Sequence, residues 1–249
     1  MVLSNSPLTK MLLEVPAHTD IESIPEKCGA VAEIFDSSGK LALKPFELAE
    51  RAHPSDVWFE LNVSSSHFKR GIEEMAKLAH MGFSNFKILL SGLKEPADIY
   101  RARLLAAECG FSFGAAVPFG VIVEYPAIAL SHEAISKAGA SFAVVDVDAL
   151  SKRIMFSEKT PDALPEPVIK IIRNSIAHFK GIKMHVSARG SMLEKVSVMK
   201  EITKQGIDSI VTHPVKSEKL KVKLLYAEKS HEVDFLKDKM RLHLKSRAR

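Results

Sequence analysis

Acidic residues that directly follow short apolar runs are the best placed in this chain to do chemistry. Glu124 follows the run 121–123, while Asp146 and Asp148 follow the run 142–145. A short, continuous apolar run is typical of a strand buried on both faces, as in parallel sheets. The carboxyl ends of parallel strands share one edge of the sheet, so these carboxylates can converge. Converging hard oxygen ligands suit a magnesium ion that also holds substrate oxygens. The alternative is that Asp146 or Asp148 caps a turn and Glu124 alone faces the ligand.

Other polar residues fall at further predicted strand ends. We predict Ser187 and His213 as candidate catalytic groups, His213 as a hydrogen-bond donor or acid/base and Ser187 as a nucleophile without an adjacent base. Arg189 and Lys94 are candidate substrate-binding residues, since arginine holds a carboxylate or phosphate bidentately and lysine acts as a point charge. Asn62, which ends the third predicted strand, and Arg70 are further candidate substrate-binding residues. For each of these residues the alternative is a hydrogen-bonded structural role or simple solvation.

The elements that must position these residues alternate between strand and helix. Strict alternation implies parallel strands joined by right-handed crossovers, and eight such units within 249 residues favour a closed (β/α)8 barrel over a doubly wound open sheet. We expect one α/β domain, a (β/α)8 barrel over 1–228, followed by a basic helical tail over 229–249. The predicted strands are 11–15, 30–35, 57–62, 86–91, 121–124, 142–147, 183–187 and 209–213. The predicted helices are 20–27, 46–51, 67–80, 95–109, 127–138, 165–180, 191–205 and 216–243.

Composition and missing motifs exclude several classes of protein. The sequence contains no Gly-x-Gly-x-x-Gly, P-loop or nucleophile-elbow motif, which argues against the common nucleotide-binding and hydrolase sites. No apolar run approaches the roughly 18 residues of a membrane span, and residues 1–15 lack a signal-peptide pattern. The two cysteines, Cys28 and Cys109, are too few for a disulfide framework or a zinc site. We therefore expect a cytoplasmic protein without a membrane partner.

The net charge of +5 resides in the C-terminal tail. From Lys237 onward six basic residues are accompanied by one acidic residue, Asp238, so the rest of the chain is neutral overall. Apolar residues such as Phe235, Leu236 and Met240 are interspersed among the basic ones. The tail could pack on a second subunit of a homo-oligomer, or bind nucleic acid through phosphate charge alone. We regard nucleic acid as the less favoured partner, and a frayed, solvated helix end as the alternative to both.

Five segments resemble the C-terminal barrel of phosphoenolpyruvate-utilising enzymes, the family of phosphoenolpyruvate synthase and pyruvate phosphate dikinase. Gly82-Phe-Ser-Asn-Phe-Lys-Ile-Leu-Leu90 is similar to that family's Gly-Leu-Thr-Asn-Val-Lys-Val-Met-Ile, and Val121-Ile-Val-Glu-Tyr-Pro126 is similar to its Met-Val-Glu-x-Pro strand. The segments 141–150, 167–172 and 206–214 resemble its Phe-Ser-Ile-Gly-Thr-Asn-Asp-Leu, Pro-Ala-Val-Leu-x-Leu-Ile and Gly-Ile-x-x-Leu-Ser-Val-x-Pro motifs. The resemblance covers roughly residues 58–226 and keeps the order of the motifs.

The resemblance implies a magnesium ion that holds phosphoenolpyruvate or pyruvate. By matching position the metal ligands are Glu124 and Asp148, with Asp146 beside them. The family's arginine after strand four falls at Lys94, and its proton-donating cysteine falls at Ser187, a far poorer acid. Its strand-three arginine is missing, and Arg70 is a remnant of the segment that follows. No segment resembles the ATP-grasp or phosphohistidine domains.

Two hypotheses of function follow. In the first, the barrel binds a pyruvate- or phosphoenolpyruvate-like acid with Mg²⁺ and, if active, is a transferase or lyase that acts through an enolate. In the second, the barrel is a degenerate, non-catalytic relative with a binding or regulatory role. The loss of the family's arginines and cysteine favours the second hypothesis.

Overall fold

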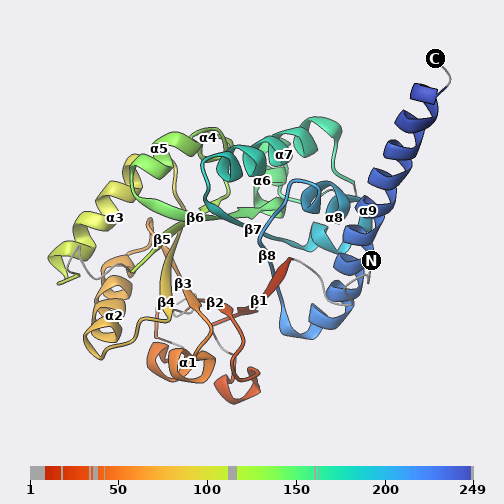
Figure 1. Cartoon of the computed structure of the whole chain (residues 1–249). Helices are drawn as coiled ribbons and strands as arrows, with labels where there is room; N and C mark the ends of the chain where they lie inside the picture. Colours follow the sequence, from red (N-terminus) through yellow and green to blue (C-terminus); the bar gives the residue numbers. More distant parts are fainter. Residues whose placement is uncertain are drawn as a thin grey trace.

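The computed structural model describes residues 9–17, 19–33, 35, 39–41, 43–111, 117–159, 161 and 163–247. Eight parallel strands form a closed barrel in sequence order, and the eighth strand pairs with the first (Figure 1). The predicted (β/α)8 barrel is confirmed, and the open-sheet alternative is excluded because every strand has two neighbours. The strands are β1 (Lys10–Val15), β2 (Ala30–Glu33), β3 (Val57–Asn62), β4 (Phe86–Ser91), β5 (Phe119–Val123), β6 (Ala140–Asp146), β7 (His185–Arg189) and β8 (Ser209–Thr212).

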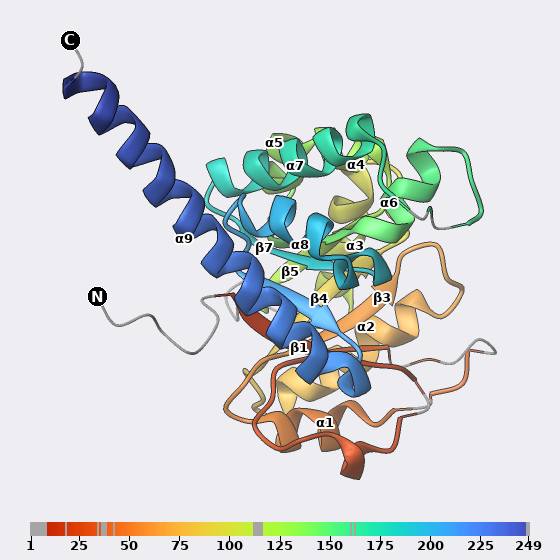
Figure 2. The same ribbon diagram turned by 90° about the vertical axis from the view of Figure 1, so that its right-hand side faces the viewer.

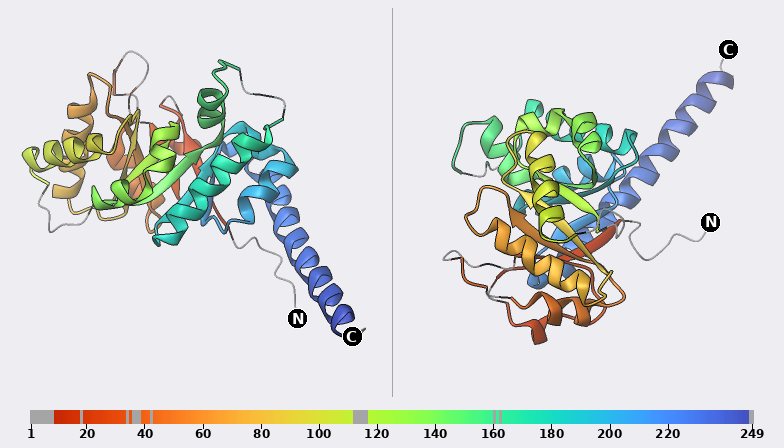
Figure 3. Two further views of the ribbon diagram at one scale, coloured as in Figure 1. Left: turned by 90° about the horizontal axis from the view of Figure 1, so that it is seen from above. Right: turned by 90° about the vertical axis from the view of Figure 1, so that its left-hand side faces the viewer.

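Helices surround the barrel on its outer side (Figures 1 and 3). Both α1 and α7 begin with proline in the first turn, where the missing N–H has no helical partner in any case. Among the described residues, none of the helices combines the length and apolar character that a bilayer-spanning segment needs. The α-helices are α1 (Pro45–Ala52), α2 (Phe68–His80), α3 (Ala97–Glu108), α4 (Pro126–Leu130), α5 (His132–Lys137), α6 (Val147–Ile154), α7 (Glu166–Gly181), α8 (Val196–Thr203) and α9 (Ser217–Arg247). The 3-10 turns are η1 (Ile21–Ser23), η2 (Ser191–Glu194) and η3 (Pro214–Lys216).

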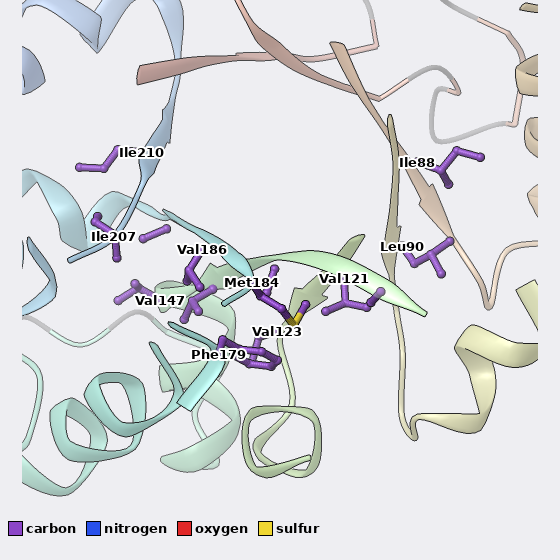
Figure 4. Packing of buried hydrophobic residues seen from close by; sticks show 14 of the residues in the cluster. Ile88, Leu90, Val121, Val123, Val147, Phe179, Met184, Val186, Ile207 and Ile210 are labelled. Carbon is purple, nitrogen blue, oxygen red and sulfur yellow. The ribbon is translucent and has the colours of Figure 1, made fainter. Parts of the chain in front are cut away.

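Side chains of the strands divide into two buried sets. Successive side chains of a strand point to opposite faces of the sheet. One set faces the helices and packs with helix side chains in the larger cluster; Figure 4 shows part of it, including Val123 and Val186 of the strands and Phe179 of α7. The other set points into the barrel and consists of buried apolar residues that include Trp58, Leu89 and Ile122. The apolar filling shows that the barrel interior is a packed core rather than a pore.

Gly120 allows two aromatic side chains to pack inside the barrel, toward the amino ends of the strands. A Cβ added at Gly120 would lie 2.2 Å from the ring of Phe142, and that ring is packed 4.6 Å, centroid to centroid, from the ring of Trp58. We predict that Gly120→Ala lowers the free energy of unfolding by about 1–3 kcal/mol, because the Phe142 ring must shift to admit the added methyl group. Urea unfolding tests this, with Gly181→Ala as a comparison, since no atom lies within 4 Å of a Cβ at Gly181.

The boundaries of several elements differ from the sequence-based predictions. The predicted helix 127–138 is two helices, α4 and α5, which are separated at Ser131. The predicted sixth strand ends at Asp146, one residue early, and residues 147–154 form a helix that the sequence analysis did not predict. The side chain of Asp146 caps that helix by accepting a hydrogen bond from the Ala149 N–H at 2.8 Å. Asp148 therefore lies in the first turn of α6 and not at a strand end.

Further differences concern the ends of β7 and of the last helix. β7 runs to Arg189, two residues beyond the predicted end, so Ser187 lies inside the strand. The predicted helix 191–205 is the turn η2 followed by α8. The last helix continues to Arg247 without a break, and the predicted boundary at 228 falls inside it. Of the predicted turn 36–39, residues 36–38 lie outside the described residues.

Candidate functional site at the carboxyl end of the barrel

The last inward-facing residues of the strands form a charged ring above the apolar interior. The register places Glu33 beside Glu60 and Asp146 beside Arg189 in adjacent strands. Glu124 immediately follows the end of β5, in the same alternation as the inward-facing Ile122. This ring lies at the face where catalytic residues sit in characterised barrels of this kind.

Arg189 is held at the centre of the ring by two carboxylates. Its Nη1 lies 2.6 Å from Glu60 Oε2, and its Nε lies 2.7 Å from Asp146 Oδ2. The three side chains are only 10–15% exposed, so water screens these ion pairs poorly. Burial lowers the pKa of Arg189, but the charges of Glu60 and Asp146 outweigh it and the pKa is raised. Arg189 is therefore a fixed, permanently charged group.

Glu124 adds a third carboxylate to this group. Its side chain is 14% exposed, and Oε2 lies 3.9 Å from Arg153 Nη2. Burial raises the pKa of Glu124, and the negative charges of Glu60 and Asp146 raise it further, against the opposing effects of Arg189 and of the Gly92 backbone N–H. The carboxylates in this part of the barrel thus outnumber the buried cation, and Glu124 is held in its ionised form at a cost.

A fourth carboxylate, Glu33, completes the acidic side of the ring. Its pKa is also raised, by partial burial and by the charge of Glu60, although its side chain stays accessible to solvent from the mouth. Glu33 and Glu60 line a cavity of about 370 Å³. Its remaining lining residues are Phe35, Gly39, Leu61, Asn62, Ser65, His67, Phe68 and Ser91. A cavity of this volume accommodates a small organic acid.

Asp148 takes a different position from Asp146. Its Oδ2 accepts a hydrogen bond from the Ser191 N–H at 2.7 Å, and its Oδ1 accepts one from the Met192 N–H at 3.0 Å. Gly190, at a φ of 127°, makes room for this contact, since a Cβ there would lie 2.8 Å from Asp148 Oδ1. Asp148 therefore joins α6 to η2, whereas Asp146 reaches the ring and caps α6 as well.

We predict that Asp148→Ala lowers the free energy of unfolding by about 2–3 kcal/mol, because two N–H groups lose a charged acceptor. Thermal unfolding at pH 7 measures this effect. If Asp148 were instead a metal ligand, the stability loss would be small without metal and the affinity for Mg²⁺ would fall. An unchanged Mg²⁺ affinity in the destabilised variant supports the structural role.

The remaining predicted residues lie apart from the ring or beneath it. Ser187 is fully buried one layer below, with its Oγ 2.5 Å from Ser209 Oγ. His213 is exposed, and its Nδ1 accepts a hydrogen bond from the Val215 N–H at 3.3 Å. Ser187 therefore cannot act on a ligand at the mouth, whereas His213 follows the inward-facing Val211 by two residues and is exposed just beyond the end of β8.

The three predicted polar substrate-binding residues other than Arg189 are exposed to solvent. Asn62 Oδ1 accepts a hydrogen bond from the Ser64 N–H at 2.9 Å, and the residue lines the cavity. The guanidinium of Arg70 lies 5.8 Å from the centroid of the Phe35 ring. Lys94 is exposed, and its backbone N–H donates to Asp98 Oδ2 at 3.0 Å. Arg189, Asp146 and Glu124 are thus the predicted residues that the fold brings together.

The sequence analysis did not identify Glu60 as a site residue. The spacing between Trp58 and Glu60 could have identified it, because side chains two residues apart on a strand point to the same face of the sheet. The predicted strand 57–62 is apolar on both faces apart from Glu60 and Asn62, so the alternation was obscured. The ion pair with Arg189 and the pairing of β2 with β3, which aligns Glu33 with Glu60, show that this side chain belongs to the ring.

The chemistry of this ring is compatible with a divalent cation. No group of three or more His, Cys, Asp or Glu side chains among the described residues is already arranged as a metal site. Magnesium, however, is commonly held by one or two carboxylates together with water and substrate oxygens. Glu124 and Asp146 offer such hard oxygens, and burial, together with the charges of Glu60 and Asp146, raises the pKa of Glu124, so a bound cation would favour its ionised form.

Comparison with known proteins places the chain near phosphoenolpyruvate synthases. A probable phosphoenolpyruvate synthase of Archaeoglobus fulgidus is 25% identical over 170 residues, which is 66% of this chain and 22% of that protein. The phosphoenolpyruvate synthase of Pyrococcus furiosus is 26% identical over 145 residues, which is 55% of this chain and 18% of that protein. The chain therefore spans about a fifth of the length of these relatives. No family model matches the chain.

Solved structures confirm the fold at low sequence identity. A citrate lyase from Burkholderia xenovorans superposes with a TM-score of 0.63 at 11% identity, covering 92% of this chain and 85% of that one. RipC from Yersinia pestis gives a TM-score of 0.59 at 14% identity, covering 87% and 94%. An HpcH/Hpal aldolase/citrate lyase family protein from Burkholderia cenocepacia gives 0.57 at 12% identity, covering 92% and 95%. The chain is thus a (β/α)8 barrel related in sequence to segments of phosphoenolpyruvate synthases.

Proposed function

We propose that the carboxyl end of the barrel binds a small pyruvate- or phosphoenolpyruvate-like acid together with Mg²⁺. The observation that carries the proposal is the convergence of Glu60, Glu124 and Asp146 around the buried cation Arg189. The similarity to phosphoenolpyruvate synthases supports this class of ligand. A cavity of about 370 Å³ adjoins the ring through Glu33 and Glu60.

Electrostatics explains why the acid and the cation belong together. An anion alone meets a mouth where carboxylates outnumber Arg189, so its binding is opposed by like charges. A magnesium ion held by Glu124 and Asp146 reverses the local charge. When bound, the ion supplies Lewis-acid stabilisation of negative charge on a substrate oxygen.

Arg189 contributes the direct contact with the acid. A guanidinium has five N–H donors, of which the Nε–H and one Nη1–H are directed to Asp146 and Glu60. The remaining donors can bond a carboxylate or a phosphate in the same plane. Glu60 and Asp146 fix the guanidinium in advance, so little rotational freedom is lost when the acid binds.

A binding or regulatory role without turnover is the second candidate. It is favoured by the position of Ser187, which is fully buried and bonded to Ser209 and therefore cannot give a proton to a ligand at the mouth. Purified protein incubated with pyruvate or phosphoenolpyruvate and Mg²⁺ distinguishes the two candidates. Measurable turnover that Arg189→Lys reduces would exclude the non-catalytic role.

Isothermal titration calorimetry with oxalate, a mimic of enolpyruvate, tests the binding proposal. We expect oxalate to bind in the presence of Mg²⁺ and to bind at least about tenfold more weakly without it. Glu124→Gln keeps the shape of the side chain and should lose this dependence on Mg²⁺. Glu158→Gln, at an exposed position, is the matched control. Equal heats for the wild type and Glu124→Gln would overturn the assignment.

A further inference from the structure

The last helix leaves the barrel halfway along its length. The first half of α9 packs against α8 and the barrel through the buried residues Leu220, Leu224 and Ala227. The hydrogen bond between Thr203 Oγ1 and His231 Nε2, at 3.0 Å, lies near the end of this contact. Beyond it the helix projects away from the rest of the molecule (Figure 2). Each described side chain from 232 to 240 is exposed.

An exposed stripe of apolar residues follows a heptad pattern along α9. Val222, Tyr226, Val233, Leu236 and Met240 are between 48% and 69% exposed. Tyr226, Val233 and Met240 are seven residues apart and take the a positions of a heptad repeat. Val222, Lys229 and Leu236 take its d positions. Alternating spacings of three and four residues are the pattern of a coiled-coil seam. This stripe, Val222 to Met240, is called the α9 seam below.

The α9 seam lies on a different face of the helix from the residues that hold it to the barrel. Leu220, Leu224 and Ala227 are at most 4% exposed, so the first half of α9 has one apolar face covered and a second one in water. A projecting helix cannot cover its own apolar face, and a segment of this length is marginally stable by itself. The α9 seam is therefore largely exposed in the single chain, where the Lys200 ammonium lies 5.0 Å from the centroid of the Tyr226 ring.

We propose that a second copy of this chain covers the α9 seam in a parallel, two-stranded coiled coil. A β-branched residue at position a, here Val233, followed by leucine at position d, here Leu236, is the combination that favours a parallel coiled coil of two helices. Lys229 within the seam fixes the register at some cost in stability.

Charges beside the seam favour the parallel orientation. Glu232 precedes Val233 and Lys237 follows Leu236, which are the flanking positions that pair between parallel helices. Glu232 of each copy then meets Lys237 of the other. In an antiparallel pair centred on the same seam, Glu232 would face its own counterpart and Lys223 would approach Lys237, so like charges would meet along both edges.

Two neighbouring residues give a matched pair of variants for the test. Leu236 lies in the seam and is 53% exposed, while Phe235 lies outside it and is 59% exposed. The full chain, Leu236→Asp and Phe235→Asp are compared by sedimentation velocity up to concentrations on the order of 100 μM. We expect the wild type and Phe235→Asp to be dimers at the upper concentrations, and Leu236→Asp to require at least about tenfold more protein to associate. Melting temperatures check that the barrel is folded.

A charge exchange tests the orientation. Glu232→Lys and Lys237→Glu should each be monomeric alone and should form a heterodimer when mixed, because each unlike pair is restored only between the two variants. A monomeric wild type, equal behaviour of Leu236→Asp and Phe235→Asp, or variants that do not recover on mixing would overturn the proposal. Retention of nucleic acid by a wild type that stays monomeric would likewise overturn it, in favour of the basic tail as a phosphate-binding segment.

Discussion

Arg189→Met is expected to lower the free energy of unfolding by about 3–5 kcal/mol at pH 7, the cost of breaking a buried ion pair from one side. Methionine has a similar length and fills much of the space, so the loss reports charge more than volume. Glu60, Asp146 and Glu124 would be left with no buried cation among them. Their mutual repulsion, poorly screened at 10–14% exposure, is the physical cause.

The pH dependence separates this charge effect from a packing effect. The pKa of Glu124 is already raised, so this carboxylate loses its charge early as the solution is acidified, and the deficit of Arg189→Met should shrink toward acidic pH. Urea unfolding between pH 4 and pH 8 measures the difference. Arg189→Lys keeps a cation, although lysine cannot bridge both carboxylates in one plane. We therefore expect Arg189→Lys to lose less stability than Arg189→Met. A deficit that is constant over this pH range would contradict the electrostatic account.

The barrel could be predicted from the sequence because its strands are short and apolar on both faces. Runs such as 121–123 and 142–145 need burial against both the barrel interior and the helices, which leaves few architectures. The end of β6 could not be placed as securely. Val147 extends the apolar run, yet Asp146 caps a helix that begins there, and a capping contact is decided by three-dimensional geometry rather than by hydrophobicity.

The site was predicted in part, for reasons that differ between residues. Glu124, Asp146 and Arg189 stand at strand ends in the sequence, and the closed barrel brings their side chains to one mouth. Asp148 has the same residue type and nearly the same position, but the two amides of η2 occupy its oxygens. Its assignment as a metal ligand stays a prediction, which this geometry disfavours.

Ser187 shows how a shift of two residues changes an interpretation. The sequence placed the end of the strand at this serine, which would expose it at the mouth, but β7 continues to Arg189. Side chains two apart share a face, so Arg189 takes the position in the ring and Ser187 lies one layer deeper. The hydrophobicity pattern defines the end of a strand poorly. The residues at the carboxyl ends of barrel strands, where functional groups lie, are therefore the ones that a sequence pattern places least accurately.

Glu124→Gln is expected to stabilise the protein at neutral pH while it removes binding of Mg²⁺ with oxalate. The pKa of Glu124 is raised above its ordinary value of 4.5 by burial and by Glu60 and Asp146. A group whose pKa is raised by folding contributes stability that is present below its unfolded pKa and is lost as the pH rises through its folded pKa. At pH 7 the ionised Glu124 is therefore a cost to the fold, which glutamine does not carry.

We expect the free energy of unfolding of Glu124→Gln to exceed that of the wild type by about 0.5–2 kcal/mol at pH 7, the range seen when a strained functional group is relieved. The difference should shrink as the pH falls below the ordinary pKa of 4.5, because the cost of ionising this buried carboxyl is lost there. Glu158→Gln, at an exposed position, should show no such pH-dependent gain. If Glu124→Gln were instead less stable at pH 7, Arg189 and Arg153 would outweigh the burial of this carboxylate. In that case the role of Glu124 in the ring would be structural. A variant that is more stable than the wild type but no longer binds Mg²⁺ with oxalate would instead identify Glu124 as a residue retained for ligand binding.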